Sequence, residues 1–335
     1  NKIKPNVTSE AILLGNLASQ FLDEEIHSKD IRVPYNDSIK TFFKNNALSL
    51  LAANVSQDFH LNAKNQKTNI QRSIGEELPK IVSSINFDNI LLEPSFFSEM
   101  LGLQGRMDLL QSDFSLLIEQ KSGKCGFPQL DADTPIALKK HYVQMLLYMT
   151  ILRYNYPVRY KENNNKLNTF LLYSKYKNSL LGLGYAPELV FQSLNIRNEI
   201  VRNEYKYAEG GISILKELTP DKINSKNVCN NLWNKYIYPQ LTALLAPIHN
   251  ATELELEYYL QFLKFIENEH IYSKVGNKQK ENSGFASKWH DTLEEKLNAG
   301  NIYDKLSLIT PYINHIGIVD EIELKFNDTT NHDIA

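Results

Sequence analysis

The sequence contains little cysteine and no long apolar segment. Cys125 and Cys229 are the two cysteines in 335 residues, which excludes a disulfide framework and any iron–sulfur cluster held by four cysteines of this chain. Unpaired cysteines are typical of a reducing compartment, so we expect a cytoplasmic protein. No apolar run approaches the roughly 18 residues that span a membrane, so we expect no membrane partner.

The sequence also lacks a basic excess, an initiator methionine and a nucleotide-binding loop. A net charge of −3 excludes a uniformly basic nucleic-acid-binding protein, although a local basic groove is compatible with it. The first residues carry no Met and no signal-peptide core, so we interpret the chain as a fragment of a longer polypeptide. No Gly-x-x-x-x-Gly-Lys-Ser/Thr segment is present, so these residues contain no P-loop ATPase.

Helical and strand-like patterns alternate along the first two thirds of the chain, which predicts an α/β fold. Helices are predicted at 8–28, through much of 36–85, from about 135 to 154 and at 187–208, with two short strands in 89–110 and one strand each at 114–123 and 168–176. Helical segments follow at 225–246, 252–272 and 285–298, and residues 315–326 alternate like a strand without partners. We therefore predict an α/β core (1–214), a helical region (215–310) and the start of a truncated β domain (311–335).

Charged residues interrupt the strand-like segments at three positions. Asp108 ends one apolar run, and Glu119 and Lys121 end the next. Residues two apart on a strand share a face, and a short hairpin would bring Asp108 beside them. Two carboxylates and a third oxygen, expected from the Gln120 backbone carbonyl, suit Mg²⁺. A lysine suits the charge that develops on a phosphate during hydrolysis. The alternative is a hairpin whose Lys121 forms a structural salt bridge.

The predicted helix after this hairpin carries polar residues on one face. His141, Gln144 and Tyr148 are spaced i, i+3, i+7. Gln144 and Tyr148 are candidates to contact a scissile phosphate, whereas Tyr148 is equally compatible with a core position. Lys139, Lys140 and Arg153 are typical of a solvated face, or of the border of a DNA groove.

These motifs in this order resemble the RecB-like branch of the PD-(D/E)xK nucleases. "GLQGRMDLL", "LLIEQKSGK" and "HYVQMLLY" match the Gly-x-x-Asp, (D/E)-x-K-x-Gly and Gln-x-x-x-Tyr motifs. The resemblance implies a restriction-endonuclease-like mixed sheet flanked by helices, with an α-helical appendage, and makes residues 1–214 the nuclease core. It implies magnesium or manganese ligands at Asp108, Glu119 and the Gln120 carbonyl, a catalytic Lys121, and Gln144 and Tyr148 as the helix pair.

Later segments are similar to the Dna-two type replication and repair nuclease–helicases. This similarity implies single-stranded or flap DNA as the substrate, and a helicase domain elsewhere in the same polypeptide. The family's leading helix usually carries a metal-binding His, where this chain has Ser19. Glu93, Glu99 and His60 are candidate replacements. We expect no iron–sulfur cluster, and we expect Cys229 to be an ordinary buried thiol. The alternative function is a catalytically weakened nuclease fold that serves as a DNA-binding module.

Overall fold

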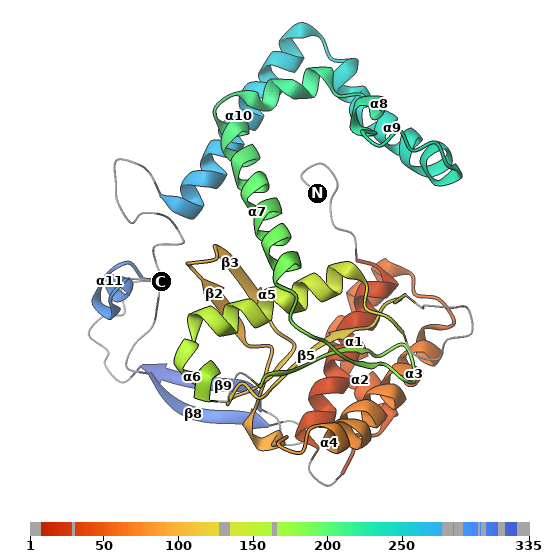
Figure 1. Cartoon of the computed structure of the whole chain (residues 1–335), viewed down its shortest axis with the longest axis vertical. Coiled ribbons are helices and arrows are strands. Elements are labelled where there is room, and N and C mark those ends of the chain that lie inside the picture. Colours follow the sequence, from red (N-terminus) through yellow and green to blue (C-terminus); the bar gives the residue numbers. More distant parts are fainter. Residues whose placement is uncertain are drawn as a thin grey trace. The chain divides into compact units, whose positions relative to one another are not determined.

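Strand β5 (Leu116–Lys121) lies in the middle of a five-stranded mixed sheet (Figure 1). The computed structural model describes residues 8–28, 31–126, 135–162, 166–276, 284, 291–300, 302, 306–313 and 319–326. The chain divides into a unit of residues 5–194 and 310–323, called the sheet unit, and a unit of residues 1–4, 195–309 and 324–335, called the helical unit. The functional boundaries predicted at 214 and 310 stay predictions.

The sheet has the strand order β1-β4-β5-β6-β7. β5 pairs in parallel with β6, and the other neighbours are antiparallel. The strands other than β5 are β1 (Ile90–Leu92), β4 (Leu109–Gln111), β6 (Asn168–Tyr173) and β7 (Leu180–Gly182). The helices and turns of this unit up to residue 162 are α1 (Glu10–His27), α2 (Tyr35–Ala53), α3 (Phe59–Arg72), η1 (Ser73–Glu77), α4 (Leu78–Ile81), η2 (Phe87–Asn89), α5 (Lys139–Asn155) and α6 (Pro157–Glu162). The predicted α/β class with a mixed sheet flanked by helices is confirmed.

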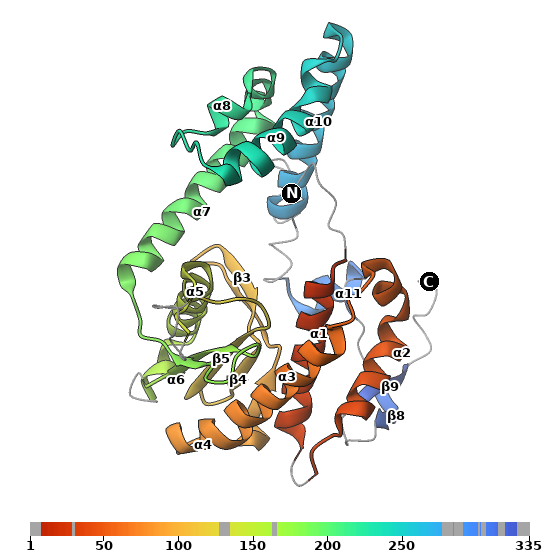
Figure 2. The same cartoon turned by 90° about the vertical axis from the view of Figure 1, so that its right-hand side faces the viewer.

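Both faces of the sheet are covered (Figure 2). Leu116 and Ile118 of β5 pack with α1 and α3, whereas Leu117 packs with α5. All three leucine and isoleucine side chains are fully buried, which is why this strand is a continuous apolar run. Side-chain alternation therefore sends every second residue of β5 toward α1 and the others toward α5.

Residues 89–110 form four strands, so the prediction of two was wrong. β1 and β4 join the central sheet, while β2 (Ser95–Ser98) and β3 (Leu103–Arg106) form a separate antiparallel hairpin. The breaks lie at Glu93, with φ +48, and Gly102, with φ +57. Glutamate rarely adopts the left-handed conformation, so a glutamate at position 93 does not mark a turn in the sequence as a glycine would.

Helix α5 begins at Lys139, so the predicted start at Pro135 was wrong. Ile136 forms an isolated antiparallel bridge with Gly126, and its N–H donates to the Gly126 carbonyl at 2.8 Å. This extended pairing prevents the helix from starting earlier.

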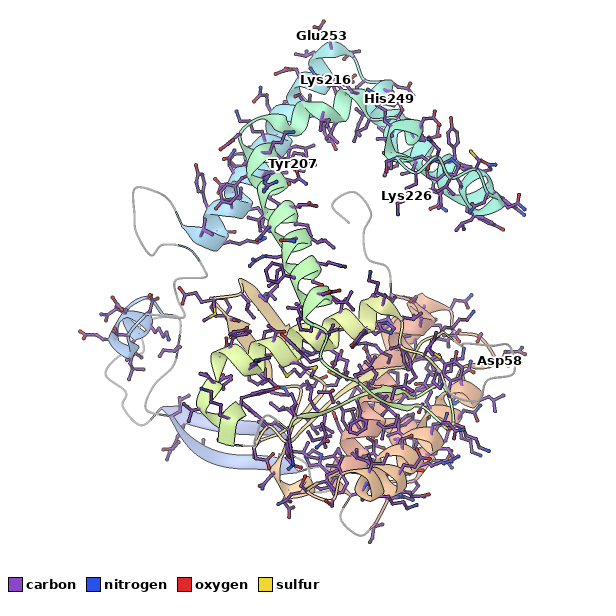
Figure 3. The ribbon with its side chains drawn as sticks, in the orientation of Figure 1. Asp58, Tyr207, Lys216, Lys226, His249 and Glu253 are labelled. Atoms are coloured by element: carbon purple, nitrogen blue, oxygen red, sulfur yellow. The ribbon has the colours of Figure 1, made fainter. Side chains whose placement is uncertain are left out.

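The helical unit contains long helices and short connecting turns. Its elements, with α7 starting in the sheet unit, are α7 (Pro187–Ala208), η3 (Gly211–Glu217), α8 (Pro220–Ile223), η4 (Trp233–Ile237), α9 (Tyr238–His249), α10 (Glu253–Val275) and α11 (Leu293–Asn298). The helix predicted at 252–272 is confirmed by α10, whose start is fixed by a capping box between Thr252 and Glu255. Lys216 of η3, which is labelled in Figure 3, pairs with Glu257 of α10 at 3.8 Å.

The final strand has a partner within this chain, so the expectation of an unpaired strand was wrong. β9 (Val319–Phe326) forms a two-stranded sheet with β8 (Leu306–Ile313). Residues 285–290 of the predicted helix at 285–298 lie outside the described residues. Among the described helices, none combines the length and apolar character needed to cross a bilayer.

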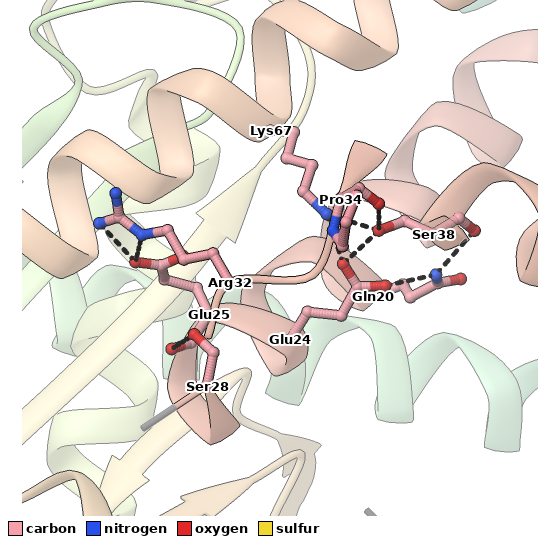
Figure 4. A network of polar contacts seen from close by, with 8 residues as sticks. All are labelled: Gln20, Glu24, Glu25, Ser28, Arg32, Pro34, Ser38 and Lys67. Carbon is pink, nitrogen blue, oxygen red and sulfur yellow. Dashed lines mark hydrogen bonds and ion pairs between the residues drawn. The ribbon is translucent and has the colours of Figure 1, made fainter. Parts of the chain in front are cut away.

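A buried ion pair joins the three N-terminal helices (Figure 4). Lys67 of α3 contacts Glu24 of α1 with 2.7 Å between Nζ and Oε2, and each side chain is 7% exposed. The Ser38 hydroxyl of α2 donates to Glu24 at 2.5 Å and accepts from Lys67. The network satisfies both charges and fixes how α1, α2 and α3 pack.

We predict that Lys67→Met lowers the free energy of unfolding by about 3–5 kcal/mol, because it leaves Glu24 as an unpaired buried charge. Urea denaturation measures this change. Lys40→Met is the control, since Lys40 is 78% exposed and lies 3.8 Å from Asp37. The control should change stability by less than about 0.5 kcal/mol. Equal losses in both variants would contradict the role of the network.

Candidate active site

Asp108, Glu119 and Lys121 lie together at one end of β4 and β5. Leu109 pairs with Ile118 in the antiparallel register, so Asp108 lies opposite Glu119 one step farther along. The backbone N–H of Gln120 donates to Asp108 Oδ2 at 2.6 Å. Glu119 and Lys121 share the face toward α5, whereas the Gln120 side chain points to α1 and donates to the Ala18 carbonyl at 3.0 Å.

The Glu119 carboxylate is buried, with the residue 2% exposed. Its Oε1 accepts from Lys121 Nζ at 2.5 Å and from Gln144 Nε2 at 2.7 Å. Its Oε2 is buried and has no hydrogen-bond partner among the residues that the structure describes. Burial, followed by the charge of Asp108, raises the pKa of Glu119 to about 7, and Lys121 partly offsets this rise. The structural salt bridge considered from the sequence is therefore present, but it satisfies half of the carboxylate.

The Asp108 carboxyl has a similar electrostatic environment. Burial raises its pKa, while the Gln120 N–H and Lys121 lower it. The raised pKa values of these two adjacent carboxyl groups therefore arise first from burial, and for Glu119 next from the charge of Asp108.

Gln144 and Tyr148 of α5 hold Glu119 in place. The Gln144 amide donates to Tyr148 Oη at 2.9 Å as well as to Glu119, and Tyr148 Oη donates to the Arg106 carbonyl at 2.7 Å. Tyr148 is 7% exposed, and burial raises its pKa to about 12, so the hydroxyl stays protonated. Tyr148 is therefore a core residue with a satisfied hydroxyl, and it acts on the site through Gln144.

A pocket of 460 Å³ opens over this group. Asp108, Gln120 and Lys121 contribute to its wall, together with Gly15, Ala18 and Ser19 of α1, Ser122, Gly123 and Lys124 of the loop after β5, and Leu138, Lys140 and His141 at the start of α5. Glu119 is not part of the wall, but it contacts Lys121, which is. Among the described residues of the wall, lysines outnumber carboxylates, so this part of the pocket suits an anionic ligand.

Ser19 and the three residues that the sequence offered as alternative metal ligands, His60, Glu93 and Glu99, are placed differently with respect to the site. Ser19 lines the pocket and donates to the Gly15 carbonyl at 3.3 Å. His60 contacts Tyr35 and the Phe43 ring, and Glu99 lies in the exposed turn between β2 and β3. Glu93 lies beside Asp108, since its N–H donates to the Asp108 carbonyl at 3.0 Å, but its carboxylate pairs with Arg106.

Asp23 of α1 lies near enough to the site for the charge of Asp108 to act on it, and the sequence analysis did not single it out. Burial and the charges of Glu93 and Asp108 raise its pKa to about 7. It lies four residues after Ser19 and therefore on the same helix face. That spacing is the signal that would have identified it.

The donor set at Asp108 and Glu119 fits a magnesium-like ion. Magnesium binds through one or two carboxylates and completes its shell with water and substrate oxygens. The buried, unpartnered Oε2 of Glu119 is the oxygen such an ion would satisfy. N–H and C=O of one strand residue face the same neighbour, so the Gln120 carbonyl is directed to the Asp108 side. Within the described residues, no group of three His, Cys, Asp or Glu side chains could hold a metal.

Neither cysteine belongs to the wall of this pocket. Both thiols are free, Cys125 is partly buried and Cys229 is exposed. The expectation of a buried Cys229 was therefore wrong, because the residue lies in the short segment between α8 and η4 rather than on an apolar helix face.

Comparison with known proteins gives one weak likeness. No known family model and no curated protein matches the chain. The chain is similar to a crystal structure from Eubacterium rectale named "putative exonuclease", with 13% identity and a TM-score of 0.34. The alignment covers 58% of this chain and 65% of that chain, so this chain spans slightly less than two thirds of its length. This likeness is too low to carry an argument, and the function is argued from the site.

We predict that Asp23→Asn changes how stability depends on pH. The folded protein keeps the Asp23 proton up to about pH 7, whereas the unfolded chain loses it near 3.8, so the aspartate destabilises the fold increasingly from pH 4 to 7. At pH 8 with a chelator, the variant should be more stable than wild type by on the order of 2 kcal/mol, and equal to it near pH 4.

Urea denaturation across this pH range measures the effect, with Asp58→Asn as a control for charge removal at an exposed position (Figure 3). A variant less stable than wild type at pH 8 would show that the Asp23 carboxylate is stabilised in the fold.

We predict that Gly105→Ala disturbs the support of Glu119. An added Cβ would lie 2.6 Å from Tyr148 Cε1, so the ring must move away from the Arg106 carbonyl. The expected loss of unfolding free energy is about 1–3 kcal/mol by urea denaturation. Gly182→Ala on β7 is the control, because its nearest neighbour, Phe170, is at an ordinary 3.7 Å. A loss no larger than that of the control would mean that the ring adapts freely.

Proposed function

We propose that the protein is a metal-dependent DNA nuclease that hydrolyses phosphodiester bonds. The observation that carries the proposal is the convergence of Asp108, Glu119 and Lys121, with Asp108 and Lys121 in the wall of one pocket. A buried oxygen of Glu119 lacks a hydrogen-bond partner among the described residues. Asp108 raises the pKa of Glu119 and thereby disfavours the ionised form that the salt bridge requires. A second carboxylate at this position would therefore weaken a salt bridge whose only role was stability.

Asp108, Glu119 and the Gln120 carbonyl are the proposed ligands of magnesium or manganese. When bound, such an ion supplies positive charge that polarises a phosphoryl oxygen and lowers the pKa of an attacking water. Glu119 keeps its orientation because Gln144 holds one oxygen and leaves the other open. Gln144 and Tyr148 are therefore positioning residues in this proposal.

Lys121 is the proposed catalytic residue on the chain itself. Its side chain is 20% exposed and reaches both Glu119 and the pocket. An ammonium there can donate hydrogen bonds to the water and to the phosphate, and can neutralise the charge that develops as the bond breaks.

The proposed substrate is single-stranded or flap DNA in replication or repair, with a helicase in the same polypeptide outside this chain. Lys124 and Lys140 at the pocket support a polyanionic substrate. The narrower assignment rests on the motif resemblance.

One observation favours a second candidate function. Ser19 replaces the expected histidine, and no three metal-binding side chains converge within the described residues. A site with two carboxylates would hold the ion weakly. The chain would then be a catalytically weakened nuclease fold that serves as a DNA-binding module.

We predict that wild type cleaves end-labelled single-stranded or flap DNA with magnesium or manganese, and that Asp108→Ala and Lys121→Ala each lower the rate about 1,000-fold. Lys206→Ala is the matched control, because Lys206 belongs to another Glu-x-Lys pair on an exposed part of α7. Its rate should equal that of wild type.

DNA binding without cleavage under any metal condition would favour the binding module. Cleavage that survives Asp108→Ala would place the active site elsewhere and contradict the proposal.

A further inference from the structure

His141 is a polar residue of the pocket that the proposed mechanism does not use. It lies in the first turn of α5, one turn before Gln144, and lines the same pocket as Asp108 and Lys121. The imidazole is half-buried, and a hydrogen bond with Tyr173 of β6 orients it.

The buried hydroxyl of Tyr173 fixes the tautomer of His141. Tyr173 at the end of β6 is fully buried, and its Oη lies 2.9 Å from His141 Nδ1. The Leu138 N–H donates to the same Oη at 3.0 Å, so the oxygen already accepts a hydrogen bond. Burial raises the pKa of Tyr173, so the hydroxyl keeps its proton, and His141 Nδ1 is the acceptor in reach.

His141 is neutral at physiological pH. Burial and the charges of Lys121 and Lys140 lower its pKa to about 4. A neutral imidazole that accepts at Nδ1 carries its proton on Nε2. That Nε2–H has no hydrogen-bond partner among the described residues, although the residue lines the pocket.

We propose that His141 binds substrate, donating a hydrogen bond from Nε2–H to a non-bridging phosphate oxygen of the nucleic acid in the pocket. The inference rests on the proposed function and extends it to a binding contact that needs no metal. Lys121, Lys124 and Lys140 line the same pocket as this donor, and Asp108 is the one carboxylate among the described residues of its wall, so the pocket suits more than one phosphate of a polymeric substrate. A neutral imidazole does not release its proton, so His141 is a binding residue and not a general acid.

The first experiment measures binding of fluorescent single-stranded DNA of about 16 nucleotides in a chelator, and steady-state cleavage with manganese. His141→Ala should weaken binding and raise KM about 10-fold, with kcat changed by less than about threefold. His141→Gln keeps an N–H donor and should recover most of the binding.

The control is Tyr142→Phe, which removes a hydroxyl from the same helix turn. Tyr142 Oη donates to the Gly184 carbonyl at 2.8 Å and lies outside the pocket wall. Its binding and KM should stay within about twofold of wild type.

The second experiment is the nitrogen spectrum of the histidine rings, with the His141 signals assigned from their loss in His141→Gln. Wild type should show the Nε2–H tautomer without titration between about pH 6 and 8. Tyr173→Phe should mix the two tautomers, because it removes the donor to Nδ1.

Cleavage by wild type that Asp108→Ala abolishes, together with unchanged binding and KM in His141→Ala, would overturn this inference and leave the nuclease function intact. An Nδ1–H tautomer or a ring that is protonated at pH 6 would overturn it as well. No cleavage by wild type, with DNA binding that still depends on His141, would overturn the nuclease function and keep the contact.

Discussion

The burial of Glu119 is the constraint on which the rest of the sheet unit depends. A carboxylate buried this deeply destabilises the fold unless it is paired. Residues of β5, α5 and β3 together supply and position its hydrogen-bond donors. Lys121 comes from the same strand, Gln144 comes from the crossover helix, and Tyr148 fixes Gln144 against the backbone of β3. Even so, one oxygen remains without a partner in the described chain. The incomplete pairing is what distinguishes this group from a structural ion pair.

The Glu24–Lys67 pair on the other face of the sheet shows the contrast. It is also buried, but Ser38 and Gln20 complete the hydrogen bonds of the carboxylate, and the pair is not part of the wall of the pocket at Asp108. The pair holds three helices together, and both carboxylate oxygens of Glu24 already accept hydrogen bonds, so no oxygen is left for a ligand. Two buried carboxylates of one chain thus serve different ends, and the difference lies in whether the surrounding donors saturate them.

The sequence alone predicted the parts of the site that follow from periodicity. Alternation along β5 placed Glu119 and Lys121 on one face, and helical spacing placed Gln144 and Tyr148 together. It could not predict the turn at Glu93, because a left-handed glutamate looks like any other, or the bridge between Gly126 and Ile136 that delays α5. Tyr173 was missed because its contact with His141 joins elements distant in sequence, and no local pattern records such a contact. Asp23 was missed although its spacing of four residues from Ser19 places both on one face of α1.

The alternation of side chains along β5 also restricts which sequence changes this strand can accept during evolution. Glu119 faces α5 and Gln120 faces α1, where its amide donates to the Ala18 carbonyl. One residue inserted or deleted before Glu119 would turn every following side chain of the strand to the opposite face. The Glu119 carboxylate would then face α1, and the Gln120 amide would face α5. Substitutions at Leu116 or Leu117 can be absorbed by repacking, but a change of length cannot. Alignments of related chains should therefore contain no gap between Leu116 and Lys121.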